Sequence, residues 1–388
     1  MRKLSDTIAR LANLRGAALM DGGFNGSSRL TGLEDFGSNP GALRAHVYTP
    51  KSLPSEAALV VVLHGCTQTA AGYDIGAGWS EMADRHGFAL LFPEQQRQNN
   101  PNLCFNWFSP EDNRRAAGEA LSIRQMIAVA ADRYSIDPAR IFVTGLSAGG
   151  AMASVMLATY PEVFAGGAII AGLPYGCAST IPQAFDSMRG HGIPGEAELA
   201  ALVRAASGHG GRWPTISIWH GSGDATVNPS NAAAIVGQWR SLHGVDVAPS
   251  TIEAVDGYPH RVWRDKEGRE VIEEYSITGM AHGTPLHTVG EDGCGRSGAY
   301  MLEASISSTH HICRFWGLLE DEGGSQQGPQ LEPECARQEF LPVPASAQAR
   351  DTKTHRIYAQ QQPADQTRAP AGVGKVIEDA LRAAGLMR

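Results

Sequence analysis

Short apolar runs alternate with amphipathic stretches along most of the chain. The apolar runs are rich in Val, Ile, Leu and Phe and end in turns that contain Gly or Pro, as buried strands do. Strands are predicted at residues 60–63, 88–92, 141–144, 168–170, 215–219 and 271–278. Between them, residues 119–134 and 148–160 place apolar side chains at helical spacing. This alternation predicts an α/β fold, with a mostly parallel central sheet and helices on both faces.

One segment interrupts the alternation. Residues 177–213 mix Gly, Pro and Ala without a clear strand pattern, and Tyr175 stands just before them. Because this stretch is long for a simple loop, we expect a small cap insertion over the sheet, at about residues 175–213. The folded domain as a whole is expected to cover residues 40–320.

The two ends of the chain differ from this central domain. Apolar residues recur at helical spacing near the start, which predicts an amphipathic N-terminal helix over residues 1–20. Residues 321–372 are rich in Gln, Pro, Glu and Ala with few large apolar side chains, and are interpreted as a polar linker. A short C-terminal helix is predicted at residues 373–388.

The charge balance excludes some classes of partner. Among 388 residues, 32 Lys and Arg stand against 40 Asp and Glu, so the net charge is 32 − 40 = −8. No strong positive field exists to attract nucleic acid or anionic lipid. The apolar runs also fall short of the roughly 18 residues that a membrane-spanning helix needs. Neither nucleic acid nor a membrane is therefore expected as a partner.

The cysteines and the N-terminal stretch bear on metal binding and compartment. Six cysteines in a chain of this length match neither a small disulfide scaffold nor a Cys-x-x-Cys metal site. The first residues mix charged and apolar side chains and lack the continuous apolar centre of a secretory signal. Without an evident secretory signal, the default expectation is a cytoplasmic location.

The motif Gly145-Leu146-Ser147-Ala148-Gly149 fits the Gly-x-Ser-x-Gly nucleophile elbow. It follows directly on a predicted strand and precedes a predicted helix, which is the context that the elbow requires. In such a turn the serine holds a strained backbone position, and the glycines avoid collisions with neighbouring backbone. An ordinary Gly/Ser turn is the alternative, but the flanking strand and helix favour a nucleophilic serine.

A nucleophilic serine needs a histidine to take its proton and a carboxylate to orient that histidine. Asp224 follows the strand at 215–219 in a glycine-rich turn, and His282 follows the strand at 271–278 in another. The order Ser147, Asp224, His282 is the order of α/β hydrolases. We expect these three residues to form the catalytic triad.

Other assignments stay open at this stage. Asp224 also fits an Asx-turn or a helix N-cap, and another of the 13 histidines is the alternative base. The rivals are His260, Asp256 and Asp265, which lie in a predicted β-hairpin at the sheet edge.

A developing oxyanion needs backbone N–H donors rather than a particular side chain. Ala148, directly after the serine, supplies one. The loop after the strand at 60–63 is expected to supply the second, with the N–H of Cys66 as first choice and that of Thr67 as second. His64 in this loop is interpreted as scaffold rather than general base.

Aromatic residues near these loops are candidates for substrate binding. Trp107 fits either a wall of the acyl pocket or a core position. Tyr73 and Trp79 are weaker candidates of the same kind. Trp219 lies inside a predicted buried strand and is expected in the core.

Five motifs stand in order within about residues 45–319: His64-Gly65-Cys66-Thr67-Gln68-Thr69, Cys104-Phe105-Asn106-Trp107-Phe108, Gly145-Leu146-Ser147-Ala148-Gly149-Gly150, His220-Gly221-Ser222-Gly223-Asp224 and Gly279-Met280-Ala281-His282-Gly283. Together they resemble the poly(3-hydroxybutyrate) depolymerase family of esterases. The resemblance implies an α/β-hydrolase fold for the catalytic domain at 40–320, a Ser-His-Asp triad, no metal or cofactor, and hydrolysis of carboxylic esters. Feruloyl and acetylxylan esterases are related to this family.

The resemblance also bears on location and substrate. It leaves an extracellular or periplasmic location open beside the cytoplasm. Unlike secreted depolymerases, the chain shows no evident signal peptide and no separate polymer-binding module. We therefore expect it to cleave soluble oligomers better than crystalline polymer.

The sequence predicts a serine esterase for short-chain esters, with a hydroxyalkanoate oligomer or polyester as its partner. Ser147 is the expected nucleophile, His282 the base and then the acid, and Asp224 the residue that orients His282. A feruloyl or acetylxylan type of carbohydrate esterase is the alternative, followed by a catalytically silent binding protein. The sequence does not determine the oligomeric state.

The positions of the cysteines suggest two bridges. Cys66 and Cys104 both border the predicted cleft, where a disulfide would brace the oxyanion loop. Cys177 and Cys294 are the next expected pair, whereas Cys313 and Cys335 are expected to be free. Reduced thiols throughout are the alternative if the protein stays in the cytosol.

Overall fold

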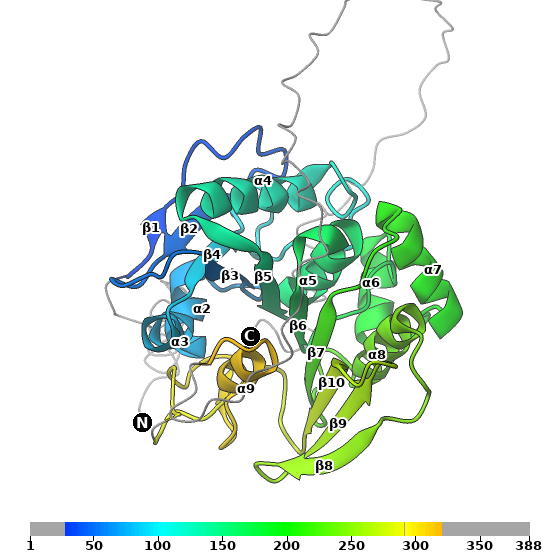
Figure 1. Ribbon diagram of the computed structural model, residues 1–388. Coiled ribbons are helices and arrows are strands. Elements are labelled where there is room, and N and C mark those ends of the chain that lie inside the picture. Colours follow the sequence, from blue (N-terminus) through cyan, green and yellow to red (C-terminus); the bar gives the residue numbers. More distant parts are fainter. Residues whose placement is uncertain (1–27, 291, 320–388) are drawn as a thin grey trace, which may run out of the picture.

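The computed structural model describes residues 28–290 and 292–319. Three expectations fall outside these residues: the N-terminal helix at 1–20, the linker at 321–372 and the C-terminal helix at 373–388. Cys335 lies outside them as well. In the described part of the chain, ten strands form one sheet that crosses the whole molecule (Figure 1).

The sheet has the strand order β1-β2-β4-β3-β5-β6-β7-β10-β9-β8. Neighbouring strands run parallel from β4 through β10, and the pairs at both outer edges are antiparallel. The strands are β1 (Thr31–Gly32), β2 (Arg44–Tyr48), β3 (Ala57–Leu63), β4 (Ala89–Glu94), β5 (Ile136–Leu146), β6 (Gly166–Ile170), β7 (Thr215–Gly221), β8 (Thr251–Val255), β9 (Tyr258–Arg264) and β10 (Glu270–Ile277).

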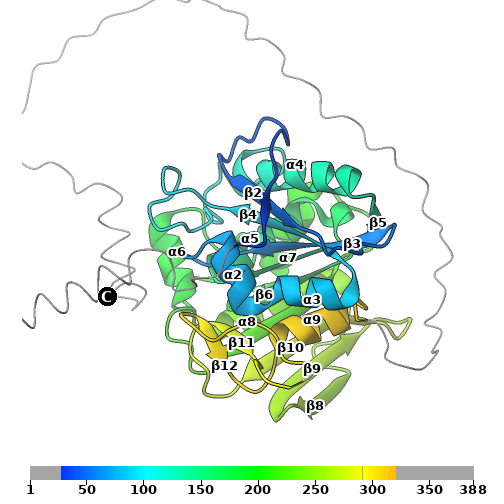
Figure 2. The same cartoon turned by 90° about the vertical axis from the view of Figure 1, so that its left-hand side faces the viewer.

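Helices connect the strands and cover both faces of the sheet (Figure 2). They are α2 (Ala70–Ala77), α3 (Trp79–His86), α4 (Gly118–Arg133), α5 (Ala148–Thr159), the short 3-10 helix η1 (Pro161–Val163), α6 (Ile181–Met188), α7 (Glu196–Ser207), α8 (Ser230–His243) and α9 (Ser308–Phe315). A separate parallel pair consists of β11 (Thr284–Leu286) and β12 (Met301–Glu303).

Strand β3 shows why the core divides into two layers. All its residues are buried, but successive side chains point to opposite faces of the sheet. Leu59, Val61 and Leu63 pack into one apolar cluster with α4, α5, α7 and α8. Val60 and Val62 pack into the other cluster with α2, α3 and α9. The predicted architecture, a mostly parallel sheet with helices on both faces, is confirmed.

The predicted elements map onto observed ones with shifted bounds. Each predicted strand overlaps one of β3, β4, β5, β6, β7 and β10, and the two predicted helices overlap α4 and α5. The sheet begins before residue 40, however, because β1 pairs with β2. The segment at 177–213, which was expected to form a small cap, contains the helices α6 and α7.

The topology brings several loops to one edge of the sheet. Strands β3, β5, β6, β7 and β10 are parallel, so their carboxyl ends meet there. The turns that follow β3, β5, β7 and β10 carry Cys66, Ser147, Asp224 and His282. Sites of open α/β sheets form at this edge. Within the described residues, every helix is too short or too polar to cross a bilayer.

Candidate active site

Ser147 occupies a tight turn between β5 and α5. Its backbone has φ 58° and ψ −118°, a region that residues with a side chain rarely adopt, and its N–H donates to the carbonyl of Ile170 over 2.9 Å. A Cβ atom at Gly145 would lie 2.4 Å from the backbone of Gly149, and one at Gly149 would lie 2.2 Å from the carbonyl oxygen of Leu63. The turn therefore requires both glycines.

Asp224 and His282 are brought together by two neighbouring strands. The ends of β7 and β10 pair in parallel, with Gly221 opposite Ile277. A Cβ atom at Gly221 would lie 2.2 Å from the carbonyl oxygen of Met280, so the two turns pack closely. Here the Nδ1–H of His282 donates to Oδ2 of Asp224 over 2.7 Å. With Nδ1 protonated, the lone pair of the neutral imidazole lies on Nε2.

Asp224 has further partners that fix its side chain. Its Oδ1 accepts from the backbone N–H groups of Thr226 and Val227 at 2.8 and 2.9 Å, which is the Asx-turn considered as an alternative. Nε2 of His220 lies 3.3 Å from Oδ2. Burial raises the pKa of Asp224, but the hydrogen bonds from His220 and His282 outweigh burial and hold the pKa below its ordinary value. The carboxylate thus stays ionised beside His282 while it also shapes its own turn.

The hydrogen bonds of the loop after β3 distinguish Cys66 from Thr67, the two candidate oxyanion donors in that loop. The N–H of Thr67 donates to the carbonyl of Asn102 over 2.7 Å, so this second choice is wrong. Within the described part of the chain, the N–H groups of Cys66 and Ala148 have no acceptor. Both residues line the same cavity as Ser147. Ala148 is the first residue of α5, where backbone donors lack helical partners.

His64 is a scaffold residue, as predicted. Its ring is 1% exposed, Nδ1–H donates to the carbonyl of Gly65 over 2.8 Å, and Nε2 accepts from the N–H of Gln95 over 3.1 Å. Burial lowers the pKa of His64, which favours the neutral ring that both bonds require.

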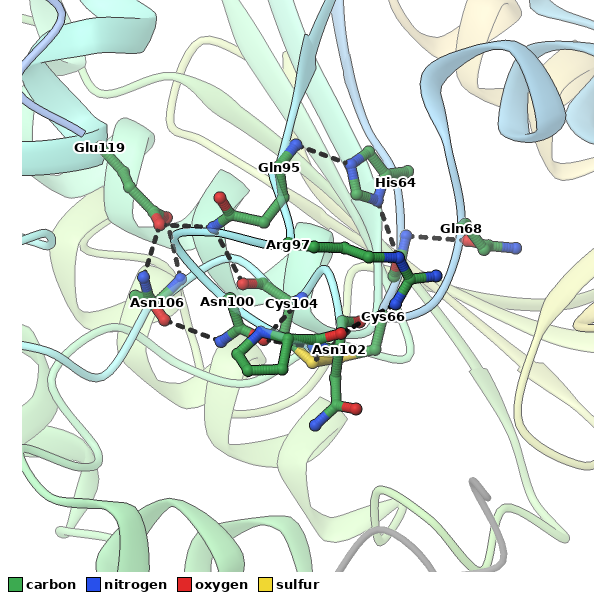
Figure 3. Close-up of a disulfide and its surroundings, with 12 residues drawn as sticks. His64, Cys66, Gln68, Gln95, Arg97, Asn100, Asn102, Cys104, Asn106 and Glu119 are labelled. Carbon is green, nitrogen blue, oxygen red and sulfur yellow. Dashed lines mark hydrogen bonds between the residues drawn. A yellow bond between two sulfur atoms is a disulfide. The ribbon is translucent and has the colours of Figure 1, made fainter. Parts of the chain in front are cut away.

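One of the two expected disulfides is present. Cys66 and Cys104 are bonded, with their Cα atoms 4.2 Å apart (Figure 3). The Cys177–Cys294 pair is wrong: both are free and buried, and they belong to clusters on opposite faces of the sheet. Burial raises the pKa of Cys177 to about 12. Cys313 is free, as expected.

An apolar cavity adjoins Ser147. Trp107 lines it and is 8% exposed, so this side chain is both a cavity wall and part of the core. Tyr73 does not line it: the ring is 0% exposed, packs in the cluster on the other face, and sets its hydroxyl 3.4 Å from Oγ1 of Thr284. The prediction of Tyr73 as a binding residue is therefore wrong. Trp79 and Trp219 are equally buried core residues.

The contribution of helix α6 to this cavity was not predicted from the sequence. Ile181, Ala184, Phe185 and Met188 of α6 line it, as do the disulfide-bonded Cys66 and Cys104. Their spacing of three and four residues is the pattern of one helix face, so the signal was present in the sequence. The many small and turn-forming residues of the segment at 177–213 obscure this apolar face in the sequence.

A buried polar cluster beside the disulfide was missed as well. Glu119, at the start of α4, is 0% exposed and accepts hydrogen bonds from Gln95 and Asn106 (Figure 3). It also accepts one from Asn99. The signal that would have found it is the run of Gln and Asn between residues 95 and 106.

The rival residues are engaged elsewhere. His260 lies in β9, with its ring nitrogens 3.2 Å from carboxylate oxygens of Glu253 and Glu273. Asp256 accepts from His311, and Asp265 pairs with Arg269. The predicted hairpin is present as β8, β9 and β10. In the part of the chain that the structure describes, no group of three or more His, Cys, Asp or Glu side chains is placed to hold a metal ion.

A sequence profile described as "Esterase PHB depolymerase" matches residues 44–257. The chain belongs to this family. Poly(3-hydroxyalkanoate) depolymerase C of Paucimonas lemoignei is 47% identical to this member over 292 residues, which cover 75% of this chain and 70% of that protein. The resemblance stated from the five motifs is confirmed.

Two further relatives of this PHB depolymerase family member are acetylxylan esterases. That of Coprinopsis cinerea is 32% identical over 266 residues, covering 67% of this chain and 70% of that protein. Among solved structures, the acetyl xylan esterase from Aspergillus awamori superposes with a TM-score of 0.63 and 26% identity, covering 76% of this chain and all of that one. The chain is a carboxylic ester hydrolase with the α/β-hydrolase fold.

Proposed function

We propose that the chain is a serine esterase that hydrolyses hydroxyalkanoate esters of short acyl length through an acyl-enzyme on Ser147. The observation that carries this proposal is the hydrogen-bonded pair of Asp224 and His282, which leaves Nε2 of His282 as the basic nitrogen. This pair stands at the same edge of the sheet as the strained turn of Ser147.

The proposed reaction begins when Nε2 of His282 takes the proton of the Ser147 hydroxyl as Oγ attacks the ester carbonyl. The N–H groups of Cys66 and Ala148 then donate to the oxyanion. The ester C–O bond breaks, the alcohol leaves with the proton from His282, and an acyl-enzyme remains. His282 then takes a proton from water as the water oxygen attacks the acyl carbon. The bond between that carbon and Oγ breaks, and the proton passes from His282 to Oγ, which releases the acid and restores Ser147. Asp224 stabilises the charged His282 in both halves of the reaction.

The cavity supports a small apolar acyl group. Apart from Ser147 and Asn100, its lining side chains are Ala, Val, Leu, Ile, Met, Phe, Trp and the disulfide cysteines. The side chain of Asn100 is already hydrogen-bonded within the protein, since its Oδ1 accepts from the backbone N–H of Asn102 and its Nδ2 donates to Asn106. Such walls suit the methyl-branched chain of a hydroxyalkanoate, the substrate type in the name of the Paucimonas lemoignei relative.

A carbohydrate ester is the second candidate substrate, because the Coprinopsis cinerea relative is named an acetylxylan esterase. An acetyl group also fits an apolar cavity, so the acyl group does not distinguish the two substrate classes. They have to be distinguished by the alcohol part of the ester. The test compares kcat/KM for soluble 3-hydroxybutyrate oligomers, acetylated xylo-oligosaccharides and feruloyl esters of sugars. We expect the first to exceed the others by at least about tenfold, and a reversed order overturns the substrate proposal.

The chemistry itself is tested by labelling with a fluorophosphonate and mapping the modified peptide. Ser147 is expected to carry the label, and Ser147→Ala is the matched control that neither labels nor turns over ester. Loss of a triad serine costs on the order of 10⁴ to 10⁶ in rate. A wild-type protein that remains unlabelled would instead identify a silent hydrolase fold.

A further inference from the structure

Glu119 is an unusual side chain to find inside an apolar core. It is 0% exposed at the second residue of α4, and both of its oxygens accept hydrogen bonds. Oε1 accepts from Nε2 of Gln95 at 2.6 Å, from Nδ2 of Asn106 at 2.8 Å and from Nδ2 of Asn99 at 3.2 Å. Oε2 accepts from the backbone N–H of Asn106 at 2.8 Å. One carboxylate thus collects four donors.

These donors come from the segment that carries Cys104 and borders the cavity. Asn106 directly precedes Trp107, and its Oδ1 accepts from Nδ2 of Asn100. Nε2 of Gln95 donates to the carbonyl of Cys104 over 3.0 Å as well as to Glu119. Figure 3 shows Glu119 at one side of this network and the disulfide at its centre. Glu119 therefore anchors the segment from 99 to 106 to helix α4.

Two routes lead from this network to the backbone of Cys66. The first is covalent, through the disulfide to Cys104. The second runs through Gln95, whose backbone N–H donates to His64, while His64 donates to the carbonyl of Gly65. That carbonyl belongs to the same planar peptide unit as the N–H of Cys66. Fixing the carbonyl of Gly65 therefore fixes the direction in which the N–H of Cys66 points.

We propose that Glu119 is a positioning residue for ester hydrolysis: it locks Gln95 and the segment from 99 to 106 so that the N–H of Cys66 stays aimed at the oxyanion. This inference rests on the proposed function, because it assigns Glu119 a role in that same site. Glu119 touches neither the substrate nor the reacting atoms and acts only through Gln95, Asn106 and the disulfide.

The alternative is that Glu119 serves stability alone. A buried carboxylate is a costly way to stabilise a core, because the charge loses its hydration. Well-packed apolar side chains of similar volume often give equal or greater stability. Burial, followed by the nearby charge of Asp112, raises the pKa of Glu119 to about 8, whereas the hydrogen bonds from Asn106, Gln95 and Asn99 favour the ionised form. The role belongs to the ionised form, so the variants are compared at a pH above this pKa. What the carboxylate offers and an apolar side chain does not is a set of acceptors that fixes three loop amides in one arrangement. Precise placement is what an oxyanion donor requires.

The experiment uses Glu119→Gln. This substitution keeps the shape of the side chain but replaces one acceptor oxygen with an NH2 group, which is a donor and faces groups that are donors themselves. We expect kcat on p-nitrophenyl acetate to fall by about tenfold or more, because a displaced oxyanion donor costs less than the roughly 10² of a deleted one. The affinity for butylboronic acid, which forms a tetrahedral adduct with a catalytic serine, should fall by a similar factor. KM should change by less than about threefold. If Glu119 served stability alone, the substitution would lower the melting temperature but leave kcat and the boronate affinity of the folded variant nearly unchanged.

The matched control is Glu273→Gln. Glu273 is also a buried glutamate, and it accepts from Oγ of Ser217 at 2.6 Å in the middle of β10. We expect this variant to lose stability but to keep kcat and boronate affinity within about twofold. If Glu119→Gln does not fold, Gln95→Met decides. It removes the side-chain donor to Glu119 and Cys104 but keeps the backbone N–H that bonds His64, and a smaller loss of kcat and boronate affinity is expected.

Fluorophosphonate labelling of the wild type separates the two proposals. If Ser147 is not labelled in the wild type, the proposed function fails and the role of Glu119 fails with it. If the wild type is labelled and active, but folded Glu119→Gln or Gln95→Met keeps kcat and boronate affinity within about twofold, only the role of Glu119 is overturned.

Discussion

The Nδ1–H of His282 donates to Oδ2 of Asp224 over 2.7 Å, although 58 positions separate the two residues along the chain. The contact exists because β7 and β10 are neighbouring parallel strands whose carboxyl ends meet at one edge of the sheet. Strand β8 and strand β9, which lie between them in sequence, are placed on the outer side of β10. Sheet order, rather than chain distance, thus brings the acid to the histidine.

Asp224→Asn tests this contact with little change in shape. The remaining oxygen can still accept from Thr226 and Val227, so the turn should persist. The amide in place of Oδ2 cannot accept the proton of His282, which favours the wrong tautomer. We expect kcat to fall by about 10³ to 10⁴ with a shift in melting temperature of only a few degrees. Unchanged kcat in the folded variant would remove Asp224 from the mechanism.

The Cys66–Cys104 bridge should be visible by peptide mapping of the unreduced protein. Alkylation after denaturation without reductant should modify Cys177, Cys294 and Cys313 but neither bridged cysteine. The bridge spans 38 residues, for which chain entropy gives about 4 kcal/mol of stability. Cys104→Ser should therefore lower both the free energy of unfolding and kcat, because the segment beside the oxyanion loop loses its covalent tie. Full alkylation of Cys66 in the unreduced wild type would contradict this.

The cavity walls predict a short acyl preference. We expect kcat/KM for model esters to peak at two to about four acyl carbons and to fall beyond about six, since further methylenes gain none of their roughly 0.8 kcal/mol of burial. Phe185→Ala in α6 should shift the optimum to longer chains, because this ring lines the cavity. Trp107→Ala should raise KM for hydroxybutyrate oligomers more than it lowers turnover of an acetyl ester.

The control for chain length is Phe36→Ala, which removes a ring that packs against the same core cluster but does not line the cavity. Its optimum should stay where that of the wild type is. A wild-type optimum at ten or more carbons would refute the assignment of this cavity as the acyl pocket.

His243 predicts a loss of stability in mild acid. The ring is half-buried in the last turn of α8, with Nε2 3.0 Å from the carbonyl oxygen of Pro214, and loss of hydration lowers its pKa to about 4. Between pH 6.5 and 4 the unfolded chain binds a proton that the folded protein does not. The free energy of unfolding should therefore fall as the pH drops through this window, by roughly 3 kcal/mol in total.

Denaturant unfolding at several pH values checks this, with His243→Gln as the comparison. The glutamine amide can still donate to Pro214 but does not titrate. The stability difference between wild type and variant should shrink or reverse as the pH falls from 6.5 to 4. Parallel curves would show that His243 titrates normally.

Local pattern was enough to predict much of this protein. The apolar runs that became β3, β5 and β7, the helix register of α4 and α5, and the elbow around Ser147 are all dictated by neighbours in the chain. Side-chain periodicity and the steric needs of a tight turn act over a few residues, so they are legible in the sequence. The five ordered motifs then predicted the family, which the comparison confirmed.

Other features depended on which segments meet across the sheet. Cys177 and Cys294 lie on opposite faces of the sheet, so they cannot form a disulfide. Tyr73 stands near the oxyanion loop in sequence, yet helix α2 turns it into the far core. The anchoring of Cys104 by Glu119 joins a loop to a helix that begins 14 positions later. Such contacts are set by sheet order and by the packing of helices on each face, which no local pattern encodes.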